Sequence, residues 1–254
     1  MTQYNYHSKC GLASKEELES PEFQELINKV KSFKISGMPN SGWDSHWSRR
    51  WEFPTVLNAL IQHHQHTPLS QVMESGCGMT QVPFWLANFG INVKGVDLQE
   101  NLKPSWEKIN TNPGRSEFIK GDMLDLPFEN NSFDASYSIS AIEHTGNAYQ
   151  AVSEMIRVTK TEGLIAFTMD LDIKNSNGIN QNDFDKTQEL LNELTIPATP
   201  FRIVPPNDIL TFNYRTIDPQ SGLVIGIKLL LNQLGIYRLK DHCIYFYYGY
   251  KKRL

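Results

Sequence analysis

Cysteine is scarce in this chain of 254 residues, which contains Cys10, Cys77 and Cys243 and no others. Their number is odd and their spacing fits no metal motif, so the sequence predicts neither a disulfide framework nor a bound metal. A long apolar run is also missing, because polar residues interrupt Leu223–Leu234. The first 20 residues lack the apolar core of a signal peptide. We therefore expect a soluble, cytoplasmic protein.

An excess of positive charge is missing as well. The formal net charge is -4, with 20% charged and 40% hydrophobic residues. Proteins that hold nucleic acids through their phosphates usually carry a basic excess, so we expect a small-molecule or peptide-like partner and no nucleic acid. The composition is that of a globular domain with its own core. It does not predict the oligomeric state.

Short apolar runs alternate with helical patterns from Gln71 to Asp170. The expected strands lie near Val72–Met73 and at Ile91–Leu98, Glu117–Ile119, Phe133–Ile139 and Leu164–Met169. This alternation predicts a parallel sheet covered by helices on both faces. A helix at Gly222–Leu234 and strands at Ile236–Leu239 and Cys243–Tyr250 would complete it. The expected fold class is α/β, with a Rossmann-like, seven-stranded, mostly parallel sheet.

The segments outside this alternation suggest how one domain, residues 1–254, is organised. The core would comprise residues 54–171 and 221–254, with a helix that begins at Pro54 and buries Leu57, Leu60 and Ile61 on one face. Residues 1–53 would form an N-terminal lid. Residues 172–220 lack sheet rhythm, and such a late insertion is often a substrate cap. The alternative is a surface excursion that does not contact the substrate.

The strongest local signal is the run from Val72 to Thr80, VMESGCGMT, at the end of the first expected strand. Glycines at Gly76 and Gly78 would let the backbone approach a nucleotide-like ligand closely. Nineteen residues after Gly78, Asp97 ends the second strand, where a carboxylate can accept hydrogen bonds from both hydroxyls of a ribose. The alternative for Asp97 is a turn or helix-capping residue.

These residues resemble the first motif of class I S-adenosylmethionine-dependent methyltransferases of the small-molecule type, an acidic residue followed by GxGxG. Thr80 stands where the family often has a third glycine. Later segments are similar to further motifs of the family and extend the resemblance over residues 70–171: Gly121–Met123, Pro127–Asp134, Ser138–His144 and Arg157–Leu164. The resemblance implies a methyltransferase (EC 2.1.1.-) with S-adenosyl-L-methionine as its cofactor.

The same resemblance implies a set of cofactor-binding residues. Glu74 would lie near the methionine amino group, Gly76 and Gly78 beneath the cofactor, Asp97 and Leu98 at the ribose, Asp122 and Met123 at the adenine, and the Ser140 backbone near the methionine portion.

His144 is the candidate base, because it follows the fourth strand, where the acceptor meets the methyl group. Histidine titrates close to neutral pH and suits proton transfer. The alternative is a structural histidine. Glu143 is the second candidate catalytic residue and would orient His144, contact the acceptor or face solvent. The Trp43–Phe53 stretch would form an aromatic lid with Arg49 or Arg50 near a carboxylate, or else pack its tryptophans into the core.

We therefore expect methyl transfer to a small-molecule or natural-product acceptor at oxygen, either a hydroxyl or a carboxylate. An N-methyltransferase of the same fold is one alternative. An NAD-dependent oxidoreductase is another, but its GxGxxG fingerprint would need a glycine or alanine where this chain has Gln81. A non-catalytic partner subunit is the third. His63, His64 and His66 are expected on an exposed helix face rather than around a metal.

Overall fold

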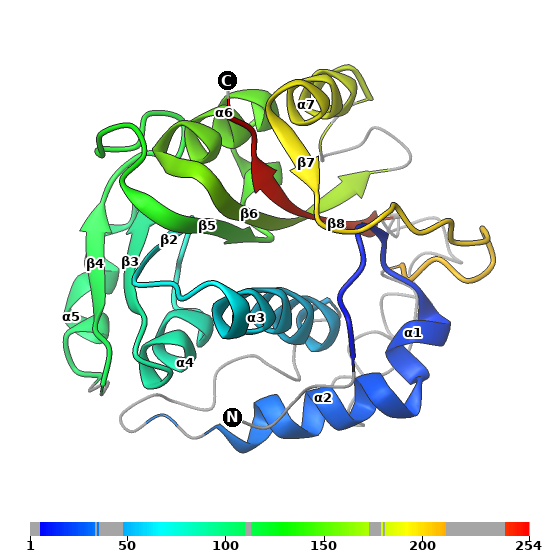
Figure 1. Ribbon diagram of the computed structural model, residues 1–254, viewed down its shortest axis with the longest axis horizontal. Coiled ribbons are helices and arrows are strands. Elements are labelled where there is room, and N and C mark those ends of the chain that lie inside the picture. Colours follow the sequence, from blue (N-terminus) through cyan, green and yellow to red (C-terminus); the bar gives the residue numbers. More distant parts are fainter. Residues whose placement is uncertain are drawn as a thin grey trace, which may run out of the picture.

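The computed structural model describes residues 6–33, 35, 48–109, 113–172, 179, 181–211 and 242–253. One mixed sheet separates helices on its two faces (Figure 1). The predicted helix at Gly222–Leu234, the predicted strand at Ile236–Leu239, and Trp43 and Trp47 of the predicted aromatic lid lie outside the described residues.

Five neighbouring strands run parallel in the order β4-β3-β2-β5-β6. Their bounds are β2 Gln71–Ser75, β3 Asn92–Asp97, β4 Ser116–Lys120, β5 Phe133–Ile139 and β6 Thr159–Asp172. The strand order reverses between β2 and β5, and at such a switch point the carboxyl ends of the strands leave a crevice for a ligand.

A second set of strands runs antiparallel to this group. β8 (His242–Lys251) pairs with β6, and the short strands β1 (Gly11–Leu12) and β7 (Thr195–Pro197) both pair with β8. The predicted fold class is confirmed: the sheet is Rossmann-like and mostly parallel, with helices on both faces. It has eight strands in the described part of the chain, where seven were expected.

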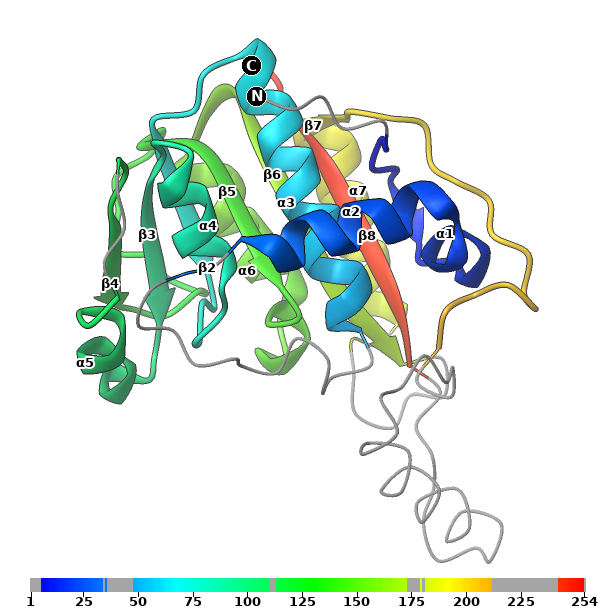
Figure 2. The ribbon, with the colours of Figure 1, turned by 90° about the horizontal axis from the view of Figure 1, so that it is seen from below.

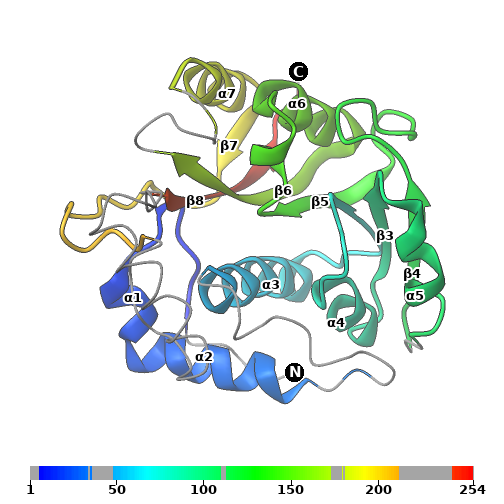
Figure 3. The ribbon, with the colours of Figure 1, turned by 180° about the vertical axis from the view of Figure 1, so that it is seen from behind.

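Helices cover both faces of the sheet (Figures 1 and 3). One face carries α6 (Ala148–Val158) and α7 (Gln181–Leu194), and the other carries α3 (Arg49–His66) and α4 (Val82–Asn88). The short helix α5 (Lys103–Trp106) lies beside β4, and two 3-10 turns, η1 (Glu100–Leu102) and η2 (Ile142–His144), follow strand ends. The helices α1 (Lys15–Glu19) and α2 (Pro21–Ser32) form a further layer, with α2 lying across the outer side of α3 (Figure 2).

The predicted start of α3 was wrong, whereas Leu57, Leu60 and Ile61 are buried as expected. The helix begins at Arg49 instead of Pro54, and every residue from Trp51 to Ile61 is buried, not one face alone. The Ser48 carbonyl accepts the first helical bonds, from the amides of Trp51 (2.9 Å) and Glu52 (3.0 Å). Pro54 removes one later bond, but a helix packed between the sheet and α2 gains burial on both sides, which outweighs that loss.

The described part of the predicted cap lies at the antiparallel edge of the sheet. β7 extends the sheet beside β8, and α7 packs against α6. The loop that follows runs along the N-terminal strand, where the amide of Arg202 donates to the Cys10 carbonyl (2.8 Å) and that of Leu210 to the Ala13 carbonyl (2.8 Å). The assignment of residues 1–53 as a lid and 172–220 as a cap stays a prediction.

None of the helices in the described ranges combines the length and apolar character that a membrane-spanning segment requires.

Candidate functional site

The carboxyl ends of the parallel strands surround a cavity of about 760 Å³. One wall, here called the loop side, consists of three loops that follow β2, β3 and β4: residues 76–81, 96–99 and 121–124. The other wall, here called the helix side, combines the start of α3 with the end of β5 and the turn η2: Arg49, Phe53, Ile139, Ser140, Ala141, His144 and Thr145. The cavity therefore occupies the switch point of the sheet.

The glycine turn after β2 is held against β3, because the amides of Gly76 (2.9 Å) and Cys77 (3.0 Å) both donate to the Val96 carbonyl. Gly76 and Gly78 adopt positive φ angles of 69° and 47°, which favour glycine. A Cβ at Gly78 would meet no atom within 4 Å and would enter the cavity. A Cβ at Gly76 would instead lie 2.4 Å from the Cβ of Ala141. The open space at Gly78 agrees with the expectation that the glycines leave room for a ligand. At Gly76, the missing side chain instead makes room for Ala141.

Trp106, which sequence reasoning missed, supports this turn from beneath. Its indole N–H donates to the Gly78 carbonyl (2.9 Å), and the side chain is 2% exposed. The ring passes over Gly95 in β3, where a Cβ would lie 2.2 Å from it. In the sequence, only the large side chain of Trp106 and the glycine at position 95 of the expected strand could have suggested this contact.

Asp97 joins the ends of two strands. One carboxylate oxygen accepts a hydrogen bond from the Gly78 amide (2.9 Å) and the other from the Gln99 amide (2.9 Å). The residue lines the cavity next to Leu98, which is 64% exposed. The carboxylate therefore stabilises the turn, as the alternative reading proposed, and also faces the space where a ribose is predicted. Each carboxylate oxygen can accept more than one hydrogen bond, so the two roles are compatible.

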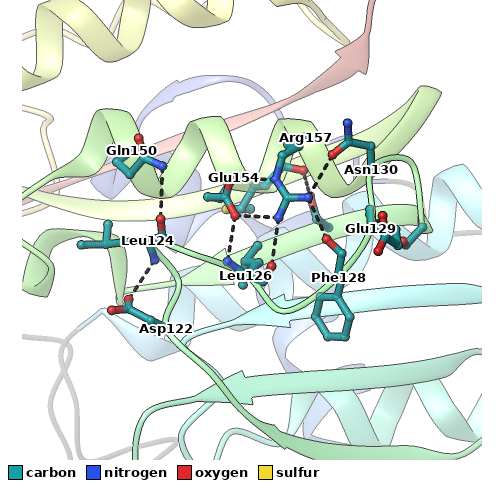
Figure 4. Close-up of polar contacts among 12 residues, drawn as sticks. Asp122, Leu124, Leu126, Phe128, Glu129, Asn130, Gln150, Glu154 and Arg157 are labelled. Atoms are coloured by element: carbon teal, nitrogen blue, oxygen red, sulfur yellow. Dashed lines mark hydrogen bonds and ion pairs between the residues drawn. The ribbon is translucent and has the colours of Figure 1, made fainter.

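The loop that carries Asp122 and Met123 is bonded to α6 at several points after Met123, from Leu124 to Asn130 (Figure 4). The Arg157 guanidinium donates to the carbonyls of Phe128 (2.7 Å) and Leu126 (2.9 Å). Glu154 accepts from the Leu126 amide (2.8 Å). The same loop begins with a tight turn, in which the Asp122 carboxylate accepts a hydrogen bond from the Leu124 amide (2.9 Å).

Arg157 and Glu154 also pair with each other through two bonds of 2.7 Å. The hydrogen bond from Arg157 keeps the pKa of Glu154 below its usual range, so the pair is ionised at neutral pH. Bidentate pairs of this kind combine strength with a defined orientation. The Pro127–Asp134 and Arg157–Leu164 motifs of the sequence therefore act together to position the cavity wall at Asp122.

Glu74 is fully buried behind the glycine turn and does not line the cavity. Its carboxyl group accepts hydrogen bonds from the Thr80 hydroxyl (3.0 and 3.1 Å) and the Tyr137 hydroxyl (3.2 Å). Burial raises the pKa of Glu74 to about 8. Thr80 stands where the family often has glycine, and its hydroxyl is a hydrogen-bond donor to Glu74 that a glycine could not supply.

On the helix side, Ser140 adopts a φ of +46°, which is unusual for a residue with a side chain. Its amide donates to the Thr168 hydroxyl (3.2 Å), and its own hydroxyl donates to Glu52. His144, in η2, is exposed and lines the cavity. Ser140 and His144, two of the predicted site residues, therefore lie on the same wall of the cavity.

Three acidic side chains gather behind this wall: Glu52 of α3, Glu143 of η2 and Asp170 near the end of β6. We call them the carboxyl cluster. Burial, together with the charges of Asp170 and Glu52, raises the pKa of Glu143 well above its usual range. Burial and the charge of Glu52 raise the pKa of Asp170 to about 7. The positive charge of the Arg49 guanidinium lowers the pKa of both Glu143 and Asp170.

Eight of the ten predicted site residues line the cavity: Gly76, Gly78, Asp97, Leu98, Asp122, Met123, Ser140 and His144. Glu74 and Glu143 lie behind its walls. Sequence reasoning raised Arg49 only as a possible carboxylate contact and missed Glu52, whose position depends on where α3 begins. The roles of all ten stay predictions.

Two of the three histidines at the end of α3 have structural contacts. The His63 ring packs on Tyr250 with 5.5 Å between centroids, and His64 Nδ1 accepts from the Leu69 amide (2.9 Å). Within the described ranges, no group of three or more histidine, cysteine or carboxylate side chains is placed to hold a metal ion.

Comparison with known proteins identifies a domain type. A family model described as a methyltransferase domain matches residues 73–167. Cycloartenol-C-24-methyltransferase 1 of Oryza sativa subsp. japonica is 28% identical over 169 residues, which cover 61% of this chain and 48% of that protein. Malonyl-(acyl-carrier protein) O-methyltransferase of Salmonella typhimurium is 24% identical over 142 residues, or 56% and 54% of the two chains. The chain thus spans about half the length of the curated relatives it matches.

A solved structure shares the fold over nearly the whole chain. Geranyl diphosphate C-methyltransferase from Streptomyces coelicolor A3(2), solved with Mg²⁺, geranyl diphosphate and S-adenosyl-L-homocysteine, has a TM-score of 0.54 and 15% identity. The likeness covers 97% of this chain and 92% of that one.

Proposed function

This chain contains a class I S-adenosylmethionine-dependent methyltransferase domain, and from that premise we propose that it methylates an oxygen atom of a small-molecule acceptor. The predicted family is confirmed by the methyltransferase-domain match. That match and the S-adenosyl-L-homocysteine complex of a structural relative indicate S-adenosylmethionine as the cofactor. The proposal rests on the observation that Ser140 and His144 line one wall of the cavity and the glycine turn lines the other.

In the proposed complex, the cofactor lies along the loop side. Its ribose hydroxyls donate to Asp97, and its adenine ring packs between Leu98 and Met123 with its amino group at Asp122. The Gly78 backbone then lies beneath the adenosyl portion, where nothing blocks its approach. Glu74 acts from behind the turn, through the hydroxyl of Thr80, which lines the cavity.

Arg49 is proposed to bind the carboxylate of the cofactor's methionine portion. It lines the cavity, its Nη1 is shielded from solvent without a hydrogen-bond partner, and its charge lowers the pKa of Glu74. A buried guanidinium nitrogen without a partner is costly, and a carboxylate can satisfy it with a charge-assisted bond. The Arg49 guanidinium also lies 5.1 Å from the centre of the Phe53 ring, which restricts its orientation.

The acceptor is proposed to enter on the helix side, near Phe53, Ser140 and His144. The methyl sulfonium of the cofactor is already activated, so the protein must align an acceptor lone pair with the S–CH₃ bond and exclude water. Positioning of this kind supplies up to about 7–11 kcal/mol in favourable cases. For a hydroxyl acceptor, His144 accepts the proton that leaves as the O–CH₃ bond forms. A carboxylate acceptor needs no base.

The test is a methyl-transfer assay with a panel of small molecules and S-adenosylmethionine labelled in its methyl group. We expect a labelled product whose methyl group NMR assigns to oxygen. A methyl group on carbon, as the names of two relatives suggest for those proteins, or on nitrogen would refute the oxygen assignment. Binding of S-adenosylhomocysteine without turnover of any acceptor would support a non-catalytic partner subunit. A cavity that binds NADH instead would indicate an oxidoreductase.

A further inference from the structure

The first turn of α3 forms part of the helix side of the cavity, because Arg49 and Phe53 both line it. We propose that Glu17 on α1 is a positioning residue, which fixes this turn through the indole of Trp51 and so directs Arg49 toward the carboxylate of the cofactor. This inference rests on the proposed function in that Arg49 is taken to bind that carboxylate. Glu17 itself does not line the cavity and acts only through another side chain.

Trp51 lies on the side of α3 that faces away from the cavity. Successive residues of an α-helix are rotated by about 100°, so Arg49 and Phe53, one turn apart, share a face and Trp51 lies nearly opposite to them. The Trp51 ring is fully buried and packs on Phe23 of α2, with 6.5 Å between the ring centroids. Its indole N–H donates to a carboxylate oxygen of Glu17 (2.8 Å). A shift of Trp51 therefore moves the backbone that carries Arg49.

The first turn of α3 depends on side-chain anchors, because it has fewer helical backbone bonds than a turn in the middle of a helix. The first amides of a helix have no partner within it, and Pro54 has no N–H to donate to the Arg50 carbonyl. Glu52, one member of the carboxyl cluster, anchors the turn to the sheet by accepting from the Thr168 hydroxyl (2.6 Å). Trp51 anchors it on the other side. Together the two anchors set the rotation of the turn about the helix axis.

The Glu17 carboxylate is held by groups from three other segments. Its side chain is 8% exposed and pairs with the Arg202 guanidinium (2.5 Å), and it also accepts from the Tyr6 hydroxyl. The Arg202 guanidinium in turn donates to the Leu12 carbonyl (2.5 Å). With the indole of Trp51, three different donors converge on one nearly buried carboxylate. Hydrogen bonds to a charged group are stronger than neutral ones, so this carboxylate can hold the indole in one place.

α1 is tied to the loop that carries Arg202. The Ser14 hydroxyl caps the helix by accepting from the Glu17 amide (3.1 Å), and the Asp208 carboxylate accepts from the Glu16 amide (2.8 Å). A helix of five residues is too short to be stable alone. These bonds therefore make Glu17 a fixed point against which the first turn of α3 is set.

A rotation of this turn would affect one contact of the proposed complex in particular. A guanidinium binds a carboxylate best with its plane aligned to the two oxygens, so the bond from Arg49 depends on direction. The proposed contacts of the adenosine portion lie on the loop side and do not involve α3. Loss of the bond between Trp51 and Glu17 should therefore weaken only ligands that carry the amino-acid carboxylate.

The experiment compares two ligands by titration calorimetry. S-adenosylhomocysteine carries the carboxylate, whereas methylthioadenosine has the same adenosine and a thioether sulfur but no amino-acid portion. Trp51→Phe removes the indole N–H and keeps an aromatic ring. We expect it to weaken binding of S-adenosylhomocysteine by about tenfold and that of methylthioadenosine by less than about twofold. In an Arg49→Ala background it should have no further effect on either ligand, because both substitutions act on the same contact.

Glu17→Gln is the second variant, and it keeps the test open should Trp51→Phe fold poorly. It removes the charge on which the three donors converge, so it should show the same selective loss. Tyr248→Phe is the matched control, because it also loses one hydroxyl or N–H donor, in this case to the Ser8 carbonyl (2.8 Å). Both affinities should be unchanged in the control. Thermal unfolding identifies the variants that are folded at the temperature of the titration.

The outcomes separate this inference from the proposed function. Wild-type affinity for S-adenosylhomocysteine in both variants, an equal loss for both ligands, or a loss that persists in the Arg49→Ala background would overturn the role of Glu17 and leave the proposed function intact. If Arg49→Ala alone does not weaken S-adenosylhomocysteine, the proposed role of Arg49 falls together with this inference. If the wild type binds neither ligand, the proposed function falls as well.

Discussion

The loop side and the helix side of the cavity are built from different kinds of structure. The loop side consists of three loops, each directly after a parallel strand. Backbone amides that donate to carbonyl and carboxylate oxygens hold these loops in place. The helix side joins α3 to the ends of β5 and β6, which are 88 and 116 residues away from Glu52 along the chain. The first wall consists of turns at strand ends that Trp106 and α6 support. The second depends on packing between α3 and the sheet that buries charged groups.

This difference predicts that substitutions on the two sides have separable effects. Changes on the loop side should alter cofactor affinity, whereas a change at His144 on the helix side should alter turnover.

The largest expected effect is on turnover. His144→Ala should lower kcat for a hydroxyl acceptor by about 10²-fold, the lower end of what a general base contributes. The dissociation constant of S-adenosylhomocysteine should not change, because His144 is proposed to act on the acceptor and to make no contact with the cofactor. His66→Ala, an exposed histidine at the end of α3, serves as the control. Unchanged turnover in His144→Ala would remove His144 from the mechanism.

Gly78→Ala should weaken binding of S-adenosylhomocysteine by about 2 kcal/mol, or roughly thirtyfold, because the new methyl group enters the cavity. Gly90→Ala is the matched control. Gly90 also has a positive φ, of 87°, and its nearest neighbour to a new Cβ would lie 3.5 Å away, but it does not line the cavity. Both variants should lose similar stability from backbone strain, about 1–2 kcal/mol. Equal loss of affinity in the two variants would mean that strain alone explains the effect.

Trp106→Phe should weaken the same binding by about 1 kcal/mol, the net value of one hydrogen bond. The ring still packs on Gly95, but the bond to the Gly78 carbonyl is lost. Calorimetry measures the change, and thermal unfolding checks that the packing is retained. Full affinity in this variant would show that the turn needs no support from α5.

The last effect concerns the pH dependence of folding stability, not ligand affinity or turnover. Burial raises the pKa of Glu74 to about 8 and, with the charge of Glu52, that of Asp170 to about 7. Between pH 5 and 8 the folded protein therefore holds protons that the unfolded chain has released. This stabilisation is complete below about pH 4 and is lost as the pH rises through 7 to 8, by about 1 kcal/mol per pH unit for each proton.

Urea unfolding of the ligand-free protein from pH 5 to 8 measures this loss. Glu74→Gln should flatten the profile. Glu154, whose pKa is lowered by its bond to Arg157, acts in the opposite direction and at more acidic pH, so it does not mask the effect. A stability that rises across this window would contradict the assignment of buried, protonated carboxyl groups.

The sequence predicted the loop side well because its signals are local. The strand at Phe133–Ile139 has the predicted bounds, Asp97 ends a strand as expected, and Gly78 and Asp122 follow strands. Alternation of strands and helices, together with glycine at a turn, needs no knowledge of distant contacts.

The helix side was predicted less well because tertiary packing decides it. Pro54 suggested a helix start, but burial on two sides extends α3 back to Arg49 and brings Glu52 to Ser140. Nothing in the sequence near Glu52 indicates a partner 88 residues away. Trp106 escaped notice for the same reason, since its partners Gly78 and Gly95 lie on other elements.

A crystal structure with S-adenosylhomocysteine bound tests the central claim most directly. Our account predicts the adenosine along the loop side, with both ribose hydroxyls within hydrogen-bonding distance of the Asp97 carboxylate and the sulfur near Ser140. Adenosine bound elsewhere, or a ribose that makes no contact with Asp97, would contradict it.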